Sequence, residues 1–401
     1  MFGLGAGLDH LLAPSRSVDS SDTFSGLGGA AIPFYGIHQA GIDTPAQEFL
    51  DFAAFDVISD SVDDLRDILK EWTSAAAALT AGRSYEPVSG EASMAPTDTG
   101  EAIGLGSSQL TITVGFGASL FGSGGHDRFG LVRRPSMLVG LPPFQGESID
   151  LQRSEGDLCV QACANDPQVA FHAIHVLARL ANGAATLRWS QQGFGRTSST
   201  SSSQATPRNL MGFKDGTDNI RAEDTDAMER FVWVQPSDGS RWMVNGSYLI
   251  VRRIQILFDV WDATSLEGQE RVIGRKKQSG APLGAKDEYD PVDLAAKTNG
   301  SPTIPTDAHI RLASPRYNKG QRILRRGYSY SEPPAPGSGQ IDAGLFFICF
   351  QRDPRRQFIP IQRRLAASDA LNHHTLHTAS AIFACPPGCQ PGSFIGEGLF
   401  A

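Results

Sequence analysis

Two segments of the sequence share one pattern and decide the expected fold. Residues 157–181 are DLCVQACANDPQVAFHAIHVLARLA, and residues 344–368 are GLFFICFQRDPRRQFIPIQRRLAAS. Each is a β-rich apolar run, followed by Asp-Pro and then by apolar residues at helical spacing. Asp166 and Asp353 are expected to cap the helices, with the proline at the first helical position, where its missing N–H costs nothing. The pattern predicts one strand–helix unit that is used twice, once in each half.

The sequence around these units completes a repeated order of strands and helices. The expected elements of the first half are strands at residues 48–58, 109–117 and 184–193 and a helix at about 60–81. Those of the second half are strands at residues 230–235, 246–261, 326–331 and 345–351 and a helix opened by a capping box from Thr264 to Glu267. Strand–helix–strand order in both halves predicts an α+β fold of two ferredoxin-like domains.

The expected domains meet at a serine-rich segment. Residues 1–30 are Gly/Ser-rich and are expected to form a flexible N-terminal arm. The first domain is expected at 31–208 and the second at 209–401. Residues 195–209, GRTSSTSSSQATPRN, are either a flexible linker or a loop that helps to form a site, and both interpretations stay open.

Composition excludes several classes of partner. The chain has 401 residues, 40% of them apolar, which is enough for a sizeable core, and a net charge of −8. This acidic balance gives no reason to expect nucleic acid or anionic lipid. No apolar run approaches the ~18 residues of a membrane span. The N-terminus lacks a basic region followed by a long apolar core, so we do not identify it as a signal peptide.

Five cysteines argue against a complete disulfide framework, because their number is odd. Cys159 and Cys163 fall in one expected strand, which places their Cα atoms ~13 Å apart, beyond disulfide reach. Cys385 and Cys389 flank Pro-Pro-Gly and could meet in a turn, so a bond between them stays open.

The motif GFKDGT, residues 212–217, places a carboxylate between two glycines. Asp-Gly favours a surface turn, because Asp bonds its own backbone and Gly accepts positive φ. A calcium loop is excluded, because Ile220 stands where the required glycine would follow Asp215. A phosphate loop is excluded as well, since no Gly-Lys-Ser/Thr follows at the right spacing. The rest of the chain must decide between a turn and a functional loop.

Among nine histidines, His309 has the most distinctive surroundings. It lies in AHIRLASPR, after a long irregular segment, and the arginine pair Arg325-Arg326 follows sixteen residues later in ILRRGYSY. His172 and His175 are expected as a partly buried helical pair. His373 and His377 have the i, i+4 spacing that can bind zinc, but no third ligand accompanies them, so a helix end at the surface is the better interpretation.

These motifs resemble those of the dye-decolorising peroxidases, a family of haem enzymes. GFKDGT is similar to the family's GxxDG motif, AHIRLASPR to its proximal-histidine segment and ILRRGYSY to its distal-arginine segment. The segments PFYGIHQAGI, QATPRNLMGFKDGTDN, IGRKKQSGAPLG and GEGLFA are similar to the A-type branch, which includes deferrochelatases. The resemblance runs from about Pro33 to the C-terminus. It implies two ferredoxin-like domains with antiparallel sheets, of the dimeric α+β barrel-like superfamily, with the cofactor in the C-terminal half.

The resemblance implies a role for each matching residue. His309 would be the proximal ligand of the haem iron, with Asp369 hydrogen-bonded to it. Asp215 would be the distal acid–base residue and Arg325 the distal arginine, with Arg326 as the alternative. The remaining implied cofactor contacts are Leu345 and Phe347 on the distal wall, Arg311 near a haem propionate, and Gly216, which lets the backbone approach the haem face.

The resemblance also implies an activity. The cofactor would be haem b, and the enzyme would reduce hydrogen peroxide and oxidise dyes, phenolics or other one-electron donors through a ferryl intermediate. The alternatives are a deferrochelatase that removes haem iron and leaves the porphyrin intact, or a non-catalytic haem-binding module. The family suggests export to the periplasm or the extracellular space and a homodimer. A cytoplasmic location stays open, because the chain shows no export signal.

Overall fold

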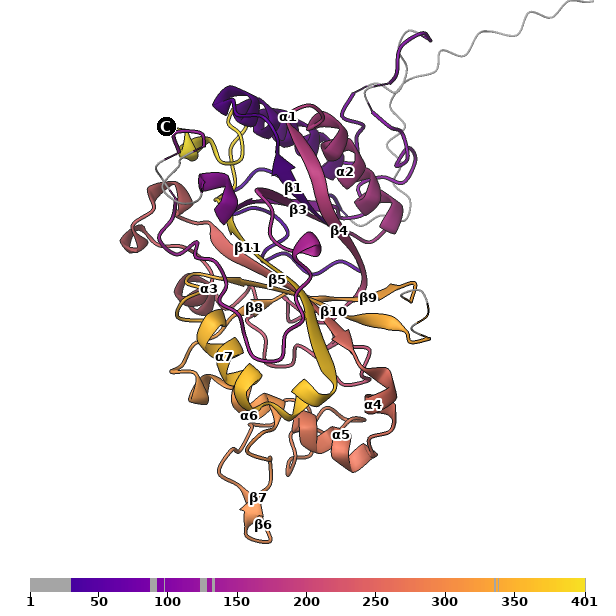
Figure 1. Ribbon diagram of the computed structural model, residues 1–401, viewed down its shortest axis with the longest axis vertical. Coiled ribbons are helices and arrows are strands. Elements are labelled where there is room, and N and C mark those ends of the chain that lie inside the picture. Colours follow the sequence, from indigo (N-terminus) through magenta and orange to yellow (C-terminus); the bar gives the residue numbers. More distant parts are fainter. Residues whose placement is uncertain are drawn as a thin grey trace, which may run out of the picture.

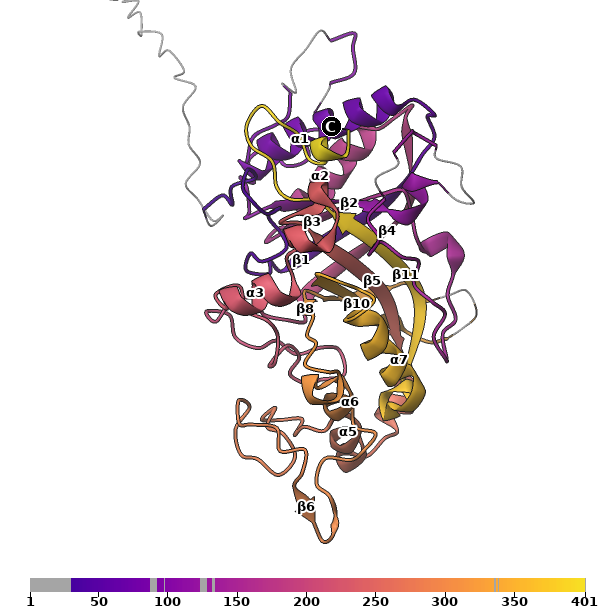
Figure 2. The same ribbon diagram turned by 90° about the vertical axis from the view of Figure 1, so that its left-hand side faces the viewer.

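The computed structural model describes residues 30–86, 92–96, 98–122, 128–131, 134–334, 337 and 339–400. In these residues the strands of both halves join into one nine-stranded antiparallel sheet, and a separate two-stranded hairpin projects from the second half (Figure 1). Helices of the first half lie at one end of the molecule and those around the cavity at the other (Figure 2). The expected N-terminal arm falls almost wholly outside the described residues.

The first half has the strand order of a ferredoxin-like domain. Its main elements are β1 (Phe49–Val57), α1 (Val62–Thr80), β2 (Thr111–Gly117), β3 (Leu158–Ala164), α2 (Pro167–Leu180) and β4 (Ala185–Arg196). The strands lie in the order β2-β3-β1-β4, and each pair is antiparallel. The expected cap of α2 is confirmed, since Asp166 accepts hydrogen bonds from the backbone N–H groups of Gln168 and Val169.

The second half repeats that order. Its main elements are α3 (Thr225–Phe231), β5 (Ser247–Ile256), α4 (Phe258–Asp262), α5 (Leu266–Ile273), β6 (Lys297–Thr298), β7 (Ser301–Pro302), α6 (His309–Ala313), β8 (Leu324–Arg325), β9 (Tyr328–Glu332), β10 (Asp342–Gln351), α7 (Phe358–Ser368) and β11 (Thr375–Cys385). The order β9-β10-β5-β11 corresponds to β2-β3-β1-β4 of the first half. The predicted duplication of an α+β unit is confirmed.

Edge strands of the two halves pair with each other and close a ring. β4 pairs with β9, β11 pairs with β2, and β5 also pairs with β10, so eight strands share one interior. Large side chains from both halves fill that interior: Phe52, Trp189, Phe346 and Phe383. Closure leaves the ring without a free edge, which is how a sheet avoids unpaired backbone groups.

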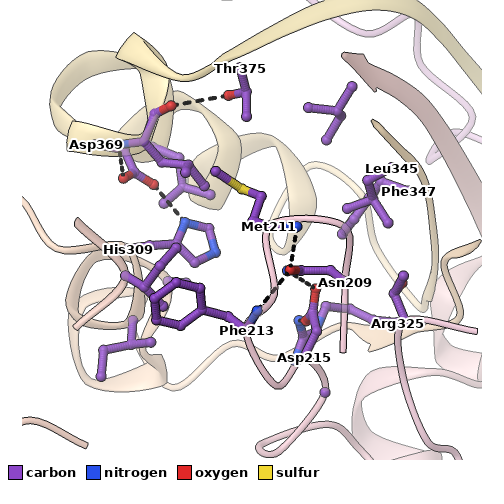
Figure 3. A pocket seen from close by; sticks show the side chains of 18 of the residues that line it. Asn209, Met211, Phe213, Asp215, His309, Arg325, Leu345, Phe347, Asp369 and Thr375 are labelled. Atoms are coloured by element: carbon purple, nitrogen blue, oxygen red, sulfur yellow. Dashed lines mark hydrogen bonds and ion pairs between the residues drawn. The ribbon is translucent and has the colours of Figure 1, made fainter. Parts of the chain in front are cut away.

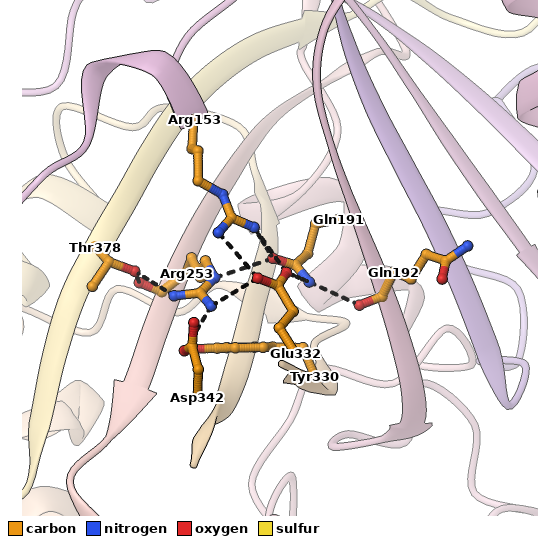
Figure 4. Close-up of polar contacts among 8 residues, drawn as sticks. All are labelled: Arg153, Gln191, Gln192, Arg253, Tyr330, Glu332, Asp342 and Thr378. Carbon is orange, nitrogen blue, oxygen red and sulfur yellow. Dashed lines mark hydrogen bonds and ion pairs between the residues drawn. The ribbon is translucent and has the colours of Figure 1, made fainter. Parts of the chain in front are cut away.

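Polar side chains of both halves close one end of this interior (Figure 4). Glu332 accepts hydrogen bonds from Arg153 at 2.8 and 3.1 Å and from Gln191 at 2.9 Å. Arg253 binds Asp342 at 2.7 Å and Glu332 at 3.3 Å. The network joins β4 of the first half to β5 and β9 of the second, so ion pairs as well as strand pairing hold the halves together.

Four local expectations in the second half are wrong. The strand expected at 246–261 ends at Ile256, because α4 covers Phe258–Asp262. Asp353 does not cap α7, because α7 begins at Phe358 with Gln357 at its N-cap; the Asp353 carboxylate instead accepts from Arg355 N–H in the turn before the helix. Residues 230–235 are not a strand, because α3 covers the start of this segment. The helix after residue 264 is capped by Ser265, one residue later than expected, with its hydroxyl accepting from Gly268 N–H.

The serine-rich segment is part of the folded structure. Thr197, Ser198 and Thr200 are buried, and the N–H of Thr197 donates to the Gly327 carbonyl at 2.8 Å. Of the two open interpretations, the structure therefore supports a loop that packs against the second half. All five cysteines lie in the described residues and are free thiols, so Cys385 and Cys389 are unbonded. Within the described ranges, no helix is long and apolar enough to cross a membrane.

Candidate active site

A cavity of about 320 Å³ lies on the outer face of the ring in the second half. Its floor consists of side chains from neighbouring strands: Arg252, Ile254 and Ile256 of β5, Leu345 and Phe347 of β10, and Thr375 and His377 of β11. These positions alternate along each strand with residues that point into the ring. The loop around Asp215 and the helices α6 and α7 supply the other walls (Figure 3).

Asp215 reaches the cavity from a tightly folded loop. Gly212 and Gly216 have φ angles of 84° and 92°, a region that favours glycine. A Cβ at Gly216 would also lie only 2.8 Å from Cα of Ser198. The Asp215 carboxylate accepts from Arg325 Nη1 at 2.8 Å and from Asn209 Nδ2 at 3.2 Å. The glycine-bracketed carboxylate is therefore held at a cavity wall by two side chains.

The two arginines of ILRRGYSY point to opposite faces of the sheet. Arg325 lines the cavity, whereas Arg326 is fully buried and donates to Gln47 Oε1 at 2.6 Å and to the Thr44 carbonyl. Strand alternation explains the difference, because Arg325 pairs with Cys349 of β10 and its neighbour must face the ring interior. The geometry thus brings Arg325, and not Arg326, to Asp215.

His309 stands at the start of α6, on the opposite side of the cavity from Asp215 and Arg325 (Figure 3). Its Nδ1 lies 2.7 Å from Oδ2 of Asp369, which is 3% exposed. A carboxylate can only accept, so Nδ1 carries the proton and Nε2 is left toward the cavity. Burial alone would lower the pKa of His309, but the charge and hydrogen bond of Asp369 outweigh it, so that the pKa is raised.

The remaining expected contacts divide into two groups. Leu345 and Phe347 face the cavity from β10, two residues apart on one side of the strand. Arg311 is not among the residues that line the cavity, and its contact with a propionate stays a prediction. Its guanidinium is buried and binds the carbonyls of Ile304 and Pro305 at 2.6 to 3.2 Å, so it fixes the segment that leads into α6.

Sequence reasoning missed several polar residues of the cavity, among them Asn209 and His377, and it wrongly expected His377 at a helix end on the surface, whereas His377 lies in β11. Asn209 bonds the Asp215 carboxylate and also accepts from the N–H groups of Met211 and Phe213. An Asn that precedes a turn is a recognisable signal for such bonds. His377 lines the cavity from β11. Its pKa is lowered to about 3, mainly by burial and to a smaller extent by the nearby charge of Arg252. Its position depends on strand order, which no local motif reveals.

Family comparisons match both halves of the chain. The model described as "Dyp-type peroxidase, N-terminal" matches residues 39–195, and "Dyp-type peroxidase, C-terminal" matches residues 206–390. Together with the duplicated fold, these matches define an oxidoreductase of the peroxidase class. The chain belongs to the Dyp-type peroxidase family, and the resemblance drawn from its motifs is confirmed.

Individual relatives can be aligned with nearly the whole chain. The dye-decolorizing peroxidase of Thermobifida fusca (strain YX) is 40% identical over 373 residues, which cover 90% of this chain and 83% of the relative. The deferrochelatase of Escherichia coli (strain K12) is 37% identical over 374 residues, covering 92% of this chain and 86% of the relative. A structure of the oxyferrous complex of DtpA from Streptomyces lividans has a TM-score of 0.85 at 39% identity, covering 94% of this chain and 98% of DtpA.

Proposed function

We propose that the cavity binds haem b and that the enzyme uses it to reduce hydrogen peroxide and oxidise one-electron donors. The observation that supports this most directly is the opposition of two polar pairs across one cavity, His309–Asp369 on one side and Asp215–Arg325 on the other (Figure 3). One side offers a metal ligand and the other offers acid–base and cationic groups. A peroxide bound between them would meet both kinds of chemistry.

The residues of the cavity fit a haem. A single imidazole nitrogen would suffice as the protein's ligand, because the porphyrin itself supplies the other nitrogens that bind its iron. Ile254, Leu345 and Phe347 provide apolar walls for the macrocycle. Arg275 also lines the cavity, where its Nη1 donates to the carbonyls of Gly280 and Glu288, and its guanidinium would be the partner of an acidic group of the cofactor.

His309 is proposed as the ligand of the haem iron. The Asp369 carboxylate accepts a hydrogen bond from the Nδ1–H group of His309. This bond fixes the tautomer and the ring orientation and makes Nε2 a stronger electron donor. When bound, haem supplies the redox chemistry that cleaves the peroxide O–O bond. Asp369 is held in place as the cap of the following turn, because its other oxygen accepts from Leu371 N–H at 2.9 Å.

Asp215 and Arg325 are proposed to act on the peroxide. The Asp215 carboxylate would take the proton from one peroxide oxygen and deliver it to the other, so that cleavage of the O–O bond releases water, with the haem supplying the two electrons. The Arg325 guanidinium stays cationic and stabilises the negative charge that develops on the leaving oxygen. Their hydrogen bond of 2.8 Å orients both groups before peroxide arrives. Leu345 and Phe347 keep this side of the cavity apolar, and Gly216 lets the loop approach it closely.

The absorption spectrum of the haem-loaded protein, before and after peroxide, tests this function together with oxidation of an anthraquinone dye. A Soret band that peroxide leaves unchanged would contradict it. The deferrochelatase function is a second candidate because relatives at 37% identity bear that name. Recovery of iron-free protoporphyrin after incubation with haem would support it, whereas recovery of intact haem would count against it.

The proposal includes bulky aromatic and small phenolic donors as reductants, a homodimer, and export to the periplasm or the extracellular space. It also includes the division into domains at residues 208 and 209. Steady-state rates with each donor class, light scattering and cell fractionation test the first three. The division would be supported if limited proteolysis cleaves the chain near residue 208 earlier than it cleaves within the strands.

A further inference from the structure

The backbone of Arg325 lies at an otherwise free strand edge. In the pairing of β8 with β10, the N–H of Arg326 donates to the Ile348 carbonyl at 2.8 Å. Neighbouring residues in an antiparallel pair direct their N–H and C=O groups to opposite sides. The N–H and C=O of Arg325 therefore point away from β10. A short strand whose edge groups lack partners would leave the arginine poorly fixed.

The side chain of Asn219 pairs with both of these groups. Its Oδ1 accepts from Arg325 N–H at 2.9 Å, and its Nδ2 donates to the Arg325 carbonyl at 2.8 Å. The same Nδ2 donates to the Ser199 carbonyl at 3.0 Å. Asn219 is 6% exposed. Its amide offers one acceptor and two donors, and so makes the hydrogen bonds that a neighbouring strand would otherwise make.

Asn219 also belongs to the loop that carries the carboxylate. It lies four residues after Asp215, and its N–H donates to the Gly216 carbonyl at 3.1 Å. Three segments therefore meet at one side chain: the serine-rich loop, the Asp215 loop that follows it, and β8, which lies about 100 residues later. This arrangement sets the position of the Arg325 backbone relative to the Asp215 loop.

We propose that Asn219 is a positioning residue. It acts by holding Arg325 in place and touches neither peroxide nor cofactor itself. The inference rests on the proposed role of Arg325 in the peroxide reaction. Because a displacement of about 1 Å in a reacting group can cost up to ~10²-fold in rate, loss of this clamp affects function beyond its effect on folding.

Gln39 offers a matched control in the first half. Its side chain is 2% exposed and makes the same three bonds: Oε1 accepts from Val114 N–H, and Nε2 donates to the carbonyls of Val114 and Pro386, at 2.8 to 2.9 Å. Gln39 does not line the cavity. Gln39→Ala thus removes an equivalent clamp from a β-strand without touching the site.

The experiment compares Asn219→Ala, Asn219→Asp, Gln39→Ala and Arg325→Leu, each loaded with haem. Spectroscopic titration with sodium fluoride measures how well the distal cation stabilises an anion at the iron, without any turnover. Stopped-flow mixing with peroxide measures the reaction. Urea unfolding reports stability separately.

Asn219→Ala should lower fluoride affinity and the peroxide rate by about 10- to 100-fold, while the KM for dye is unchanged. Asn219→Asp keeps the acceptor but loses both donors, so it should be impaired as well. Gln39→Ala should lose stability and keep its fluoride affinity.

Two results would overturn the inference alone: normal fluoride affinity in Asn219→Ala beside a loss in Arg325→Leu, or an equal loss in Gln39→Ala. Normal fluoride affinity in Arg325→Leu would instead overturn the proposed role of Arg325, and the inference with it.

Discussion

Arg325 Nη1 lies 2.8 Å from Oδ1 of Asp215, across 110 residues of sequence, and both side chains border one cavity. The pair joins an acid–base group to a permanent cation at the place where a bound peroxide would lie. Each of its members can be removed separately, and the neighbouring Arg326 provides a control of the same residue type.

Replacing Arg325 by leucine should slow the reaction with peroxide by roughly 10²- to 10³-fold, the usual cost of losing one preorganised electrostatic group. Arg326→Leu should instead lower stability, because Gln47 and the Thr44 carbonyl lose a buried donor. Stopped-flow absorbance and urea unfolding measure the two effects. The assignment fails if Arg326→Leu slows the peroxide reaction while Arg325→Leu does not.

Asp215→Asn should slow the peroxide reaction by roughly 10²- to 10⁴-fold, the range that general acid–base catalysis contributes. The amide keeps the shape of the side chain and can still accept from Arg325, so haem binding should remain. Asp226→Asn, at an exposed side chain that does not line the cavity, is the control. A variant Asp215→Asn that reacts at the unsubstituted rate would reduce the motif to a turn that shapes the wall.

His309→Ala should strongly reduce haem retention, because it removes the only proposed protein bond to iron. His373→Ala is the control, since His373 is exposed and does not line the cavity. Haem occupancy after gel filtration, measured from the Soret and protein absorbance, decides the matter. Equal occupancy in His309→Ala and the unsubstituted protein would assign the ligand to another residue.

Asp51 predicts a pH dependence of stability. Burial raises its pKa to about 7, and a hydrogen bond from Gln192 opposes this only in part. An unfolded aspartate titrates near ~3.9, so the stability that protonated Asp51 contributes is present below that pH and is lost as pH rises to 7.

Asp51→Asn cannot ionise, so its stability relative to the unsubstituted protein should rise between pH 4 and pH 8. The rise should be at most about 4 kcal/mol, at 1.36 kcal/mol per pKa unit. Urea unfolding at both pH values measures it. Asp60→Asn, at an 89% exposed side chain, should show no such rise. Equal pH profiles for Asp51→Asn and the unsubstituted protein would contradict the prediction.

The repeated strand–helix pattern was sufficient to predict the fold, because its signals are local. Asp166 followed by proline forms the expected cap, and the apolar face of α1 is buried through Leu65, Leu69 and Trp72. The same Asp-Pro signal failed at Asp353, where a turn precedes the helix and α7 begins only at Phe358. Sequence gave no sign of how the two sheets join, because the pairing of β11 with β2 depends on contacts more than 250 residues apart.

Motif resemblance found the opposed pairs of the site but could not settle which arginine faces the cavity. Strand alternation could have done so. Arg325 pairs with Cys349 of β10, and Cys349 shares the cavity-facing side of that strand with Leu345 and Phe347. Ile254 and His377 were beyond any such rule, because they reach the cavity only through the lateral order of β10, β5 and β11.

Closure of the ring has a consequence for biosynthesis. β11 is the last strand in chain order, and it supplies both the neighbour of β2 and part of the cavity floor. While the ribosome makes the second half, β2 and β4 present unpaired edges, which are prone to association with other chains. The cavity is complete only after Thr375 and His377 have been made, so a cofactor bound there cannot guide the folding of the nascent first half.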